Sequence, residues 1–135
     1  MDTPNHHEHP ELWFRPSPAL PFDVLSKFLS QEALTVTHRL GKRDGTHPKG
    51  YVPGTVATLR LFDDVRREHM CKRVRITGIT SKPLCEFDGS ELGSGACHSM
   101  DWQSLQRDLT FFEGRPIAPE ELVSSVEFTY LNHEG

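Results

Sequence analysis

The stretch of sequence that decides the fold reads Leu-Thr-Val-Thr-His-Arg-Leu and spans residues 34–40. Two sets of positions alternate along it, Leu34, Val36, His38 and Leu40 in one set and Thr35, Thr37 and Arg39 in the other. Successive side chains of a strand point to opposite faces of a sheet, so this period of two predicts a β-strand. One face of that strand then carries two hydroxyl groups beside a planar guanidinium.

Other segments on both sides of this stretch show strand or helix patterns. Strands are predicted at residues 11–15, 56–62, 73–79 and 123–131, with a charged turn at 63–69. Apolar residues recur at helical spacing in residues 22–29 and 102–112, where Pro21 suits the first helical position and Ser99 or Asp101 can cap the second helix. The sequence therefore predicts an α+β domain with a small mixed, barrel-like sheet and two or three short flanking helices.

The length of 135 residues fits one domain of ordinary size. We expect residues 1–10 to form a flexible, His-rich tail and residues 11–135 to form the domain. The chain contains neither an apolar run of the roughly twenty residues that a membrane helix needs nor a secretory signal, so we expect a cytoplasmic protein that does not bind membranes.

The cysteines and the N-terminal histidines give no sign of a cofactor or a metal. Three cysteines without a Cys-x-x-Cys pair predict reduced thiols. The imidazoles of His6, His7 and His9 lack a rigid element to hold them, which favours adventitious metal binding over a true site. Cys97 next to His98 is better explained as a buried thiol than as a nucleophile.

Charge is unevenly distributed along the chain. The net charge is −4, yet residues 38–82 hold eleven Lys or Arg against four Asp or Glu. A basic middle in an acidic chain indicates a localised anion-binding surface, with a merely solvated basic face as the alternative.

The best candidate site is the strand face that carries Thr35, Thr37 and Arg39, because hydroxyls beside a guanidinium suit a phosphate or a base edge. A loop of about a dozen residues follows, and loops of this length tend to be functional. Its bases Lys42, Arg43 and Lys49 could hold a phosphate backbone while the ring of Tyr51 stacks on a base. Arg75 extends this patch, unless it pairs with the nearby carboxylates of Asp63 and Asp64.

The tryptophans are assigned to packing, Trp13 with Phe14 on the first strand and Trp102 in the second helix.

The order of these elements resembles the ASCH domains of the PUA-like superfamily. The matching pieces are the helix at 22–29, Thr-Val-Thr-His-Arg at 35–39, Tyr-Val-Pro-Gly at 51–54 before a strand, the helix at 102–112 and the last strand. The resemblance implies a PUA-like barrel with a cleft for RNA, a nucleotide or a modified nucleoside. Members include RNA-binding modules and a small amidohydrolase that deacetylates N4-acetylcytidine.

Within this resemblance, Thr37 and Arg39 match the family's Thr and Arg. The Lys of the amidohydrolase falls on Leu34 and its Glu falls near His98, which favours a binding domain without chemistry or cofactor of its own. Such a domain would bind RNA or a nucleotide. The alternative is a hydrolase acting on a modified nucleoside. In that enzyme the Thr37 hydroxyl would react with the substrate or position it, and His98 would act as general base. A third possibility is an accessory protein whose basic face docks on an acidic partner.

Overall fold

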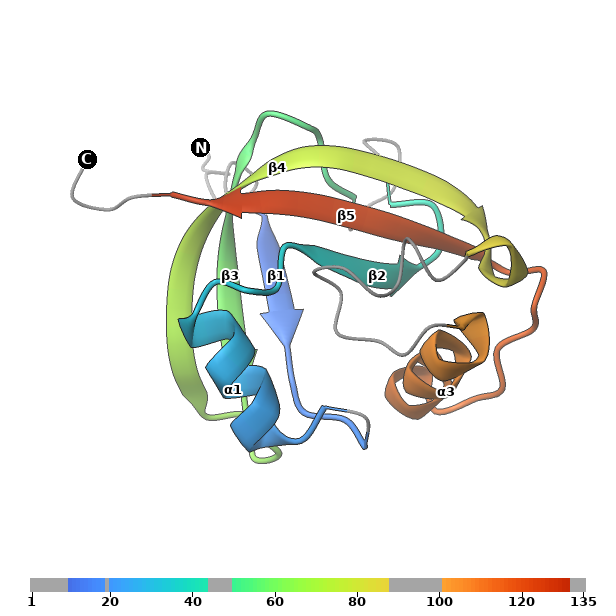
Figure 1. Ribbon diagram of the computed structural model, residues 1–135, viewed down its shortest axis with the longest axis horizontal. Helices are drawn as coiled ribbons and strands as arrows, with labels where there is room; N and C mark the ends of the chain where they lie inside the picture. The colour runs from blue at the N-terminus through green and yellow to red at the C-terminus, as the bar shows by residue number, and fades with distance from the viewer. Residues whose placement is uncertain (1–9, 19, 44–49, 88–100, 132–135) are drawn as a thin grey trace, which may run out of the picture.

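The computed structural model describes residues 10–18, 20–43, 50–87 and 101–131, and within them it contains five strands and two α-helices (Figure 1). In chain order the elements are β1 (Glu11–Phe14), α1 (Phe22–Ser30), β2 (Val36–Leu40), β3 (Val56–Phe62), β4 (Glu68–Pro83), the 3₁₀ helix η2 (Leu84–Glu86), α3 (Trp102–Glu113) and β5 (Leu122–Tyr130). Each predicted strand and helix is present, and the α+β class is confirmed.

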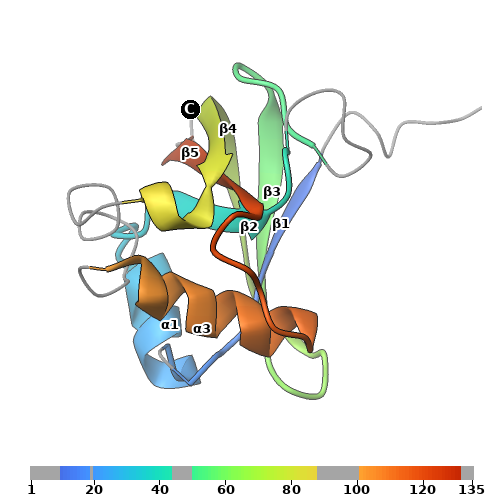
Figure 2. The same ribbon diagram turned by 90° about the vertical axis from the view of Figure 1, so that its right-hand side faces the viewer.

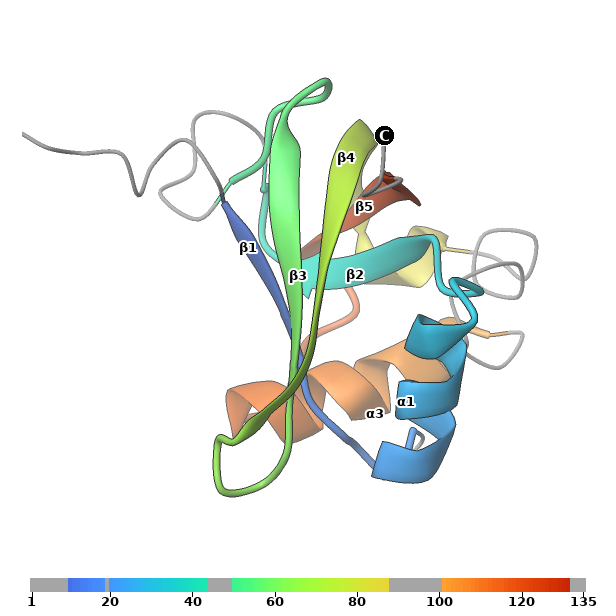
Figure 3. The same ribbon diagram turned by 90° about the vertical axis from the view of Figure 1, so that its left-hand side faces the viewer.

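The five strands form one mixed sheet in the order β1-β3-β4-β5-β2, where β1 is parallel to β3 and the other pairs are antiparallel. The 16-residue β4 pairs with β3 along its first half and with β5 along its second. Its register with β5 shifts between Ile76 and Gly78, and the ribbon bends over the molecule (Figures 1 and 3). The sheet thus curls into a half-barrel whose two free edges are β1 and β2. We call the gap between these two edges the seam.

Strand β4 is much longer than the predicted strand at 73–79. Among its first residues, from Glu68 to Lys72, Met70 alone packs against the apolar core, and the preceding turn helps to hold this segment against β3. The carboxylate of Asp63 accepts hydrogen bonds from the backbone N–H groups of Val65 and Arg67 and pairs with the side chains of Arg67 and His69. These contacts, that with His69 foremost, hold the pKa of Asp63 well below its usual range. Local polar bonding therefore extends the hairpin beyond its apolar signal.

Two apolar cores lie under the curled sheet. The first joins β1, α1 and the middle of the sheet through Leu12, Leu25, Leu59, Ile76 and Phe128, all at most 1% exposed. The second joins α3 to η2 and β5 through Leu84, Phe87, Leu105, Leu109, Ile117 and Val123. Figure 2 shows both helices on the same side of the sheet. The two cores are separate clusters, which leaves room for a cavity between them.

The ends of the helices follow their local sequence. Asp101 caps α3, because its carboxylate accepts a hydrogen bond of 3.0 Å from the backbone N–H of Ser104. Gly114 ends α3 in the left-handed region at φ 74°, as expected for a C-terminal glycine. Pro21 is the N-cap of α1 rather than its first helical residue, since its ψ of 161° is extended. Within the described part of the chain, no helix is long and apolar enough to cross a membrane.

Candidate functional site

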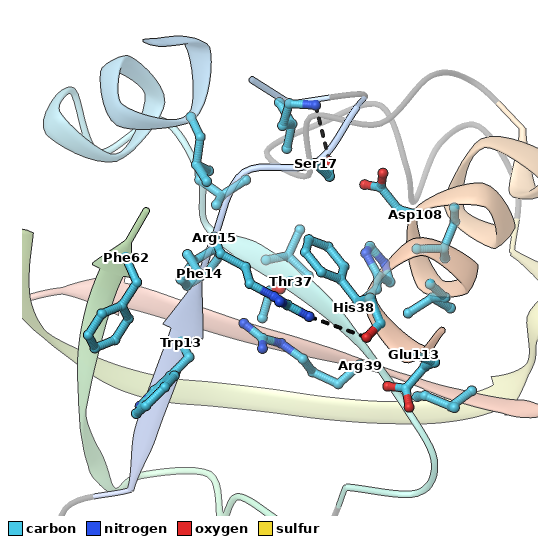
Figure 4. Close-up of a pocket in the computed structure, with 18 of the residues that line it drawn as sticks. Trp13, Phe14, Arg15, Ser17, Thr37, His38, Arg39, Phe62, Asp108 and Glu113 are labelled. Carbon is cyan, nitrogen blue, oxygen red and sulfur yellow. Dashed lines mark hydrogen bonds between the residues drawn. The ribbon is translucent and has the colours of Figure 1, made fainter. Parts of the chain in front are cut away.

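A cavity of about 310 Å³ lies between the seam and helix α3 (Figure 4). Its walls combine residues of both cores with the ends of β1 and β2, including Trp13, Phe14, Thr37, Arg39, Leu105 and Phe112. The volume is at the lower end of the about 300–1,000 Å³ typical of sites for small organic molecules. The cavity is therefore large enough for one small ligand.

Arg39 reaches this cavity because β2 is an edge strand. On one side β2 pairs with β5, with Arg39 opposite Ser124, and its other side faces the seam. The guanidinium carbon of Arg39 lies 5.1 Å from the ring centre of Phe14, which belongs to β1 at the opposite edge of the sheet. One cation–π contact thus bridges the two edges that no backbone hydrogen bond joins in the described chain.

The charge of Arg39 is enclosed by protein, and no ion pair offsets it within the part of the chain that the structure describes. Its side chain keeps some exposure toward the cavity, yet the surrounding protein removes enough water to lower the pKa of Arg39. The neighbouring charge of Arg43 lowers this pKa further, and the phenol of Tyr51 opposes the change. A guanidinium nevertheless remains charged at neutral pH. No carboxylate forms an ion pair with Arg39 among the described residues.

Three further arginines line the cavity, and each is held by contacts within the protein. Arg15 donates from Nη2 to the carbonyl of Phe112 at 3.2 Å, and its guanidinium carbon lies 4.8 Å from the Phe112 ring centre. Arg43 donates from Nε to the carbonyl of Leu40 at 2.7 Å. Arg66 stands over the ring of Trp13 at 5.4 Å. These groups therefore add positive charge to the cavity at fixed positions.

The acidic residues of the cavity wall, Asp108 and Glu113, both lie on helix α3. Asp108 is only 5% exposed, whereas Glu113 is at the exposed end of the helix. His38 also lines the cavity, is buried, and lies edge-on to Phe87 with ring centres 5.3 Å apart. The acidic groups of the described cavity wall therefore come from α3, whereas its arginines come from β2 and from the segments that follow β1, β2 and β3.

The structure brings together three of the predicted site residues, Thr37, Arg39 and Arg43, which all line the cavity. Thr35 and Lys42 are exposed and lie outside its wall. Lys49 and His98, and with them Cys97, Ser99 and the histidines of the tail, fall outside the described residues.

Two predicted site residues, Tyr51 and Arg75, do not line the cavity. Tyr51 was expected to stack on a base, but its ring is 5% exposed in the first core and its hydroxyl donates to the carbonyl of Glu11. Arg75 lies away from the cavity, where its Nη1 donates to the carbonyl of Gly54 at 2.8 Å instead of pairing with Asp63 or Asp64. The ring of Tyr51 is apolar surface although basic residues precede it in the sequence, and it is buried in the core for that reason.

Sequence reasoning missed Trp13, Arg15 and Asp108 as site residues. Trp13 is 44% exposed, since the alternation along β1 turns Leu12 and Phe14 inward and Trp13 outward. Asp108 follows Leu105 by three residues and precedes Phe112 by four, which places a carboxylate on the buried stripe of α3. The sequence shows both signals: Trp13 is an aromatic residue on the outward face of a strand, and Asp108 is a charged residue on the apolar stripe of a helix.

Comparisons with known proteins support the fold only. No protein-family model matches the chain, and no curated protein matches it in sequence. Among solved structures, the chain is similar to protein EF3133 from Enterococcus faecalis V583, described under the family model DUF984. The TM-score is 0.64 with 14% sequence identity, over 93% of this chain and 82% of that one. At this identity, the likeness shows a shared fold and gives no information on the ligand.

Proposed function

We propose that this protein is an ASCH-type domain of the PUA-like superfamily and that it binds a nucleotide, free or within RNA, in the cavity beside Thr37 and Arg39. The order of its elements and its half-barrel support the family assignment. The chemistry of the cavity supports the ligand class.

The observation that carries the proposal is the enclosed guanidinium of Arg39 at the cavity wall, which forms no ion pair with any carboxylate of the described residues. A desolvated charge without a counterion is unfavourable, and an incoming anion relieves that cost. The planar fork of arginine matches the geometry of a phosphate and can donate two parallel hydrogen bonds to it. The nearby guanidinium of Arg43 and the hydroxyl of Thr37 add a second charge and a further polar group. A phosphate is therefore the anion that fits this wall best.

The aromatic residues explain why the anion should belong to a nucleotide. Trp13 and Phe62 lie with ring centres 4.4 Å apart, and both line the cavity together with Phe14 and Phe112. Rings of this kind bind nucleobases by stacking, which contributes about 1–3 kcal/mol per base. A flat apolar ligand part beside an anionic part describes a nucleotide. The volume of about 310 Å³ admits one such unit, so an RNA strand would insert a single nucleotide.

The test is a calorimetric titration of the whole chain with nucleosides and nucleoside 5′-monophosphates at low and moderate salt. Labelled single-stranded RNA and DNA of the same sequence are titrated in parallel by fluorescence anisotropy. We expect the monophosphates to bind more tightly than the nucleosides, and RNA binding to weaken as salt rises.

Two matched variants locate the binding. Arg39→Met removes the cavity charge, and Arg73→Met removes an exposed arginine from the outer face of β4. Arg39→Met should weaken binding at least tenfold, whereas Arg73→Met should bind as the wild type does. The proposal is overturned if neither mononucleotides nor oligonucleotides bind, or if Arg39→Met binds as well as Arg73→Met.

One observation favours the hydrolase as a second candidate, namely that Thr37 lines the cavity. Leu34 lines it as well and is 3% exposed, so an apolar side chain occupies the position where the resemblance implies a lysine. We therefore place binding first. Release of acetate from N4-acetylcytidine by the wild type, and its loss in Thr37→Val, would instead establish the hydrolase.

A further inference from the structure

Two arginines of the cavity wall belong to one short stretch of chain, Arg39 within β2 and Arg43 just beyond its end. We infer that the two guanidinium groups bind one phosphate together, so that the site selects a phosphomonoester over the phosphodiesters inside an RNA strand. A phosphomonoester occurs in a free nucleoside monophosphate and at a phosphorylated end of a strand. This inference rests on the proposed function and specifies the phosphate that the cavity accepts.

The position of Arg43 is fixed by hydrogen bonds of its side chain and of its backbone. Its Nε donates to the carbonyl of Leu40 at 2.7 Å, which holds the side chain against the end of β2. Its backbone N–H donates to Oγ of Ser124 at 2.8 Å, and the same hydroxyl donates to the carbonyl of Gly41 at 2.6 Å. Ser124 is fully buried in β5 and lies opposite Arg39 in the sheet register. The turn that carries Arg43 is therefore tied to the same point of the sheet as Arg39.

The charges of the two guanidinium groups act on each other. Loss of water lowers the pKa of Arg39 most, and the charge of Arg43 lowers it further. The carboxylates of the cavity wall, Asp108 and Glu113, lie on α3, and no ion pair of the described residues joins either of them to Arg39 or Arg43. Figure 4 shows the Arg39 side chain extending from β2 toward β1. Two neighbouring positive charges thus line the ligand space, and one anion near both would relieve their repulsion.

Phosphomonoesters and phosphodiesters differ in charge and in the number of free oxygens. At neutral pH a phosphomonoester carries a charge of about −1.5 to −2 and has three acceptor oxygens. A phosphodiester inside RNA carries a single negative charge and has two oxygens that no ester bond occupies. Each arginine fork can donate two parallel hydrogen bonds, so the third oxygen gives the second fork an acceptor and the second charge offsets the second guanidinium. Screening by water is weaker in an enclosed site, which enlarges this difference.

The experiment compares ligands that share a base and differ only at the phosphate, by calorimetry on the whole chain. The tightest-binding nucleoside 5′-monophosphate is titrated beside its methyl phosphate ester, which keeps the base, the sugar and one negative charge. The wild type should bind the monophosphate at least fivefold more tightly than the ester, because the second guanidinium then gains a charge-assisted hydrogen bond. A difference of less than fivefold would refute selection of a phosphomonoester while leaving nucleotide binding intact.

Short RNA strands distinguish the two sources of the phosphate. Trinucleotides of one sequence are titrated with a 5′-phosphate, with a 3′-phosphate or with hydroxyl groups at both ends. A phosphorylated form that binds more tightly than the free monophosphate would support the strand end as the ligand, and the reverse order would support the free nucleotide. Tighter binding of the hydroxyl-ended form than of every phosphomonoester would refute the inference.

A matched pair of variants assigns the selectivity to Arg43. Arg43→Met removes the second charge and should reduce the preference for the monophosphate over its methyl ester to less than fivefold, whereas Arg73→Met, on the outer face of β4, should keep it. A full preference in Arg43→Met would refute the role of Arg43. If Arg43→Met does not fold, the comparison of monophosphate and ester on the wild type still decides. Failure of every monophosphate and of RNA to bind would instead refute the proposed function.

Discussion

Replacing Arg39 with methionine should raise the free energy of unfolding measured without nucleotide and should weaken nucleotide binding. The guanidinium is enclosed by protein, lies against Phe14 and forms no ion pair with a described carboxylate. Such a charge raises the free energy of the folded state. Methionine fills much of the same space and keeps an apolar contact with the Phe14 ring.

The magnitude follows from three opposing contributions. Relief of desolvation favours the variant by several kcal/mol for a fully buried ion, and by less here because Arg39 keeps some exposure. Loss of the cation–π contact disfavours it by about 0.5–2 kcal/mol, and the new sulfur–aromatic contact returns about 0.3–1.5 kcal/mol. The net expectation is a gain of about 1–2 kcal/mol in the free energy of unfolding. For a chain of this length, that raises Tm by roughly 3–8 °C.

The assay is urea unfolding followed by circular dichroism, with and without the tightest-binding monophosphate. Arg73→Met serves as the control, since an exposed substitution should change stability by less than about 0.5 kcal/mol. Added nucleotide should raise the urea midpoint of the wild type and of the control more than that of Arg39→Met, because the variant binds at least tenfold more weakly. A variant that is less stable than the wild type without ligand would show that Arg39 is a structural residue and would refute the reasoning.

Three other perturbations test the fold. Asp101→Ala removes the cap of α3 and should lower stability by about 1 kcal/mol in urea unfolding, while Asp101→Asn should keep most of it. Leu105→Ala opens the second core and should cost about 2–5 kcal/mol in the same assay. The ion pair with Arg115, aided by the backbone N–H of Ala118, lowers the pKa of Glu121 to about 2, so its stabilisation is complete above pH 4.5 and is lost as the pH falls toward 2. The urea midpoints of wild type and Glu121→Gln should therefore differ at pH 6 and converge on acidification.

The elements of this fold were predictable because each one carries a local pattern. The alternation in residues 34–40 reflects burial of Leu34, Val36 and His38, and the stripe from Trp102 to Phe112 reflects the packing of α3. The length of β4 was not predictable from apolar alternation, because polar contacts around Asp63 hold its first residues in the hairpin. The barrel-like curl follows from the register shift near Gly78, which the sequence marks only by a glycine.

The site was predictable on one wall only. Thr37 and Arg39 share a strand face, so sequence spacing groups them correctly. Trp13 and Asp108 come from β1 and α3, and only the curl of the sheet brings these elements to the same cavity. Ion pairing also determines which basic side chains can bind an anion. Arg60, Arg67 and Lys72 of the basic middle form ion pairs with acidic side chains, and a count of charges does not reveal this.

The seam between β1 and β2 determines what a ligand bound there would do to the sheet. Within the described residues, each edge strand is hydrogen-bonded to one neighbour, β1 through four residues to β3 and β2 through five residues to β5. A nucleotide that contacts both Arg39 on β2 and Trp13 on β1 would link the two edge strands of the sheet. A ligand at a concentration of 100 times Kd stabilises a folded protein by about 2.7 kcal/mol. Here that stabilisation would slow the local opening of the edge strands β1 and β2 more than that of β3, β4 and β5.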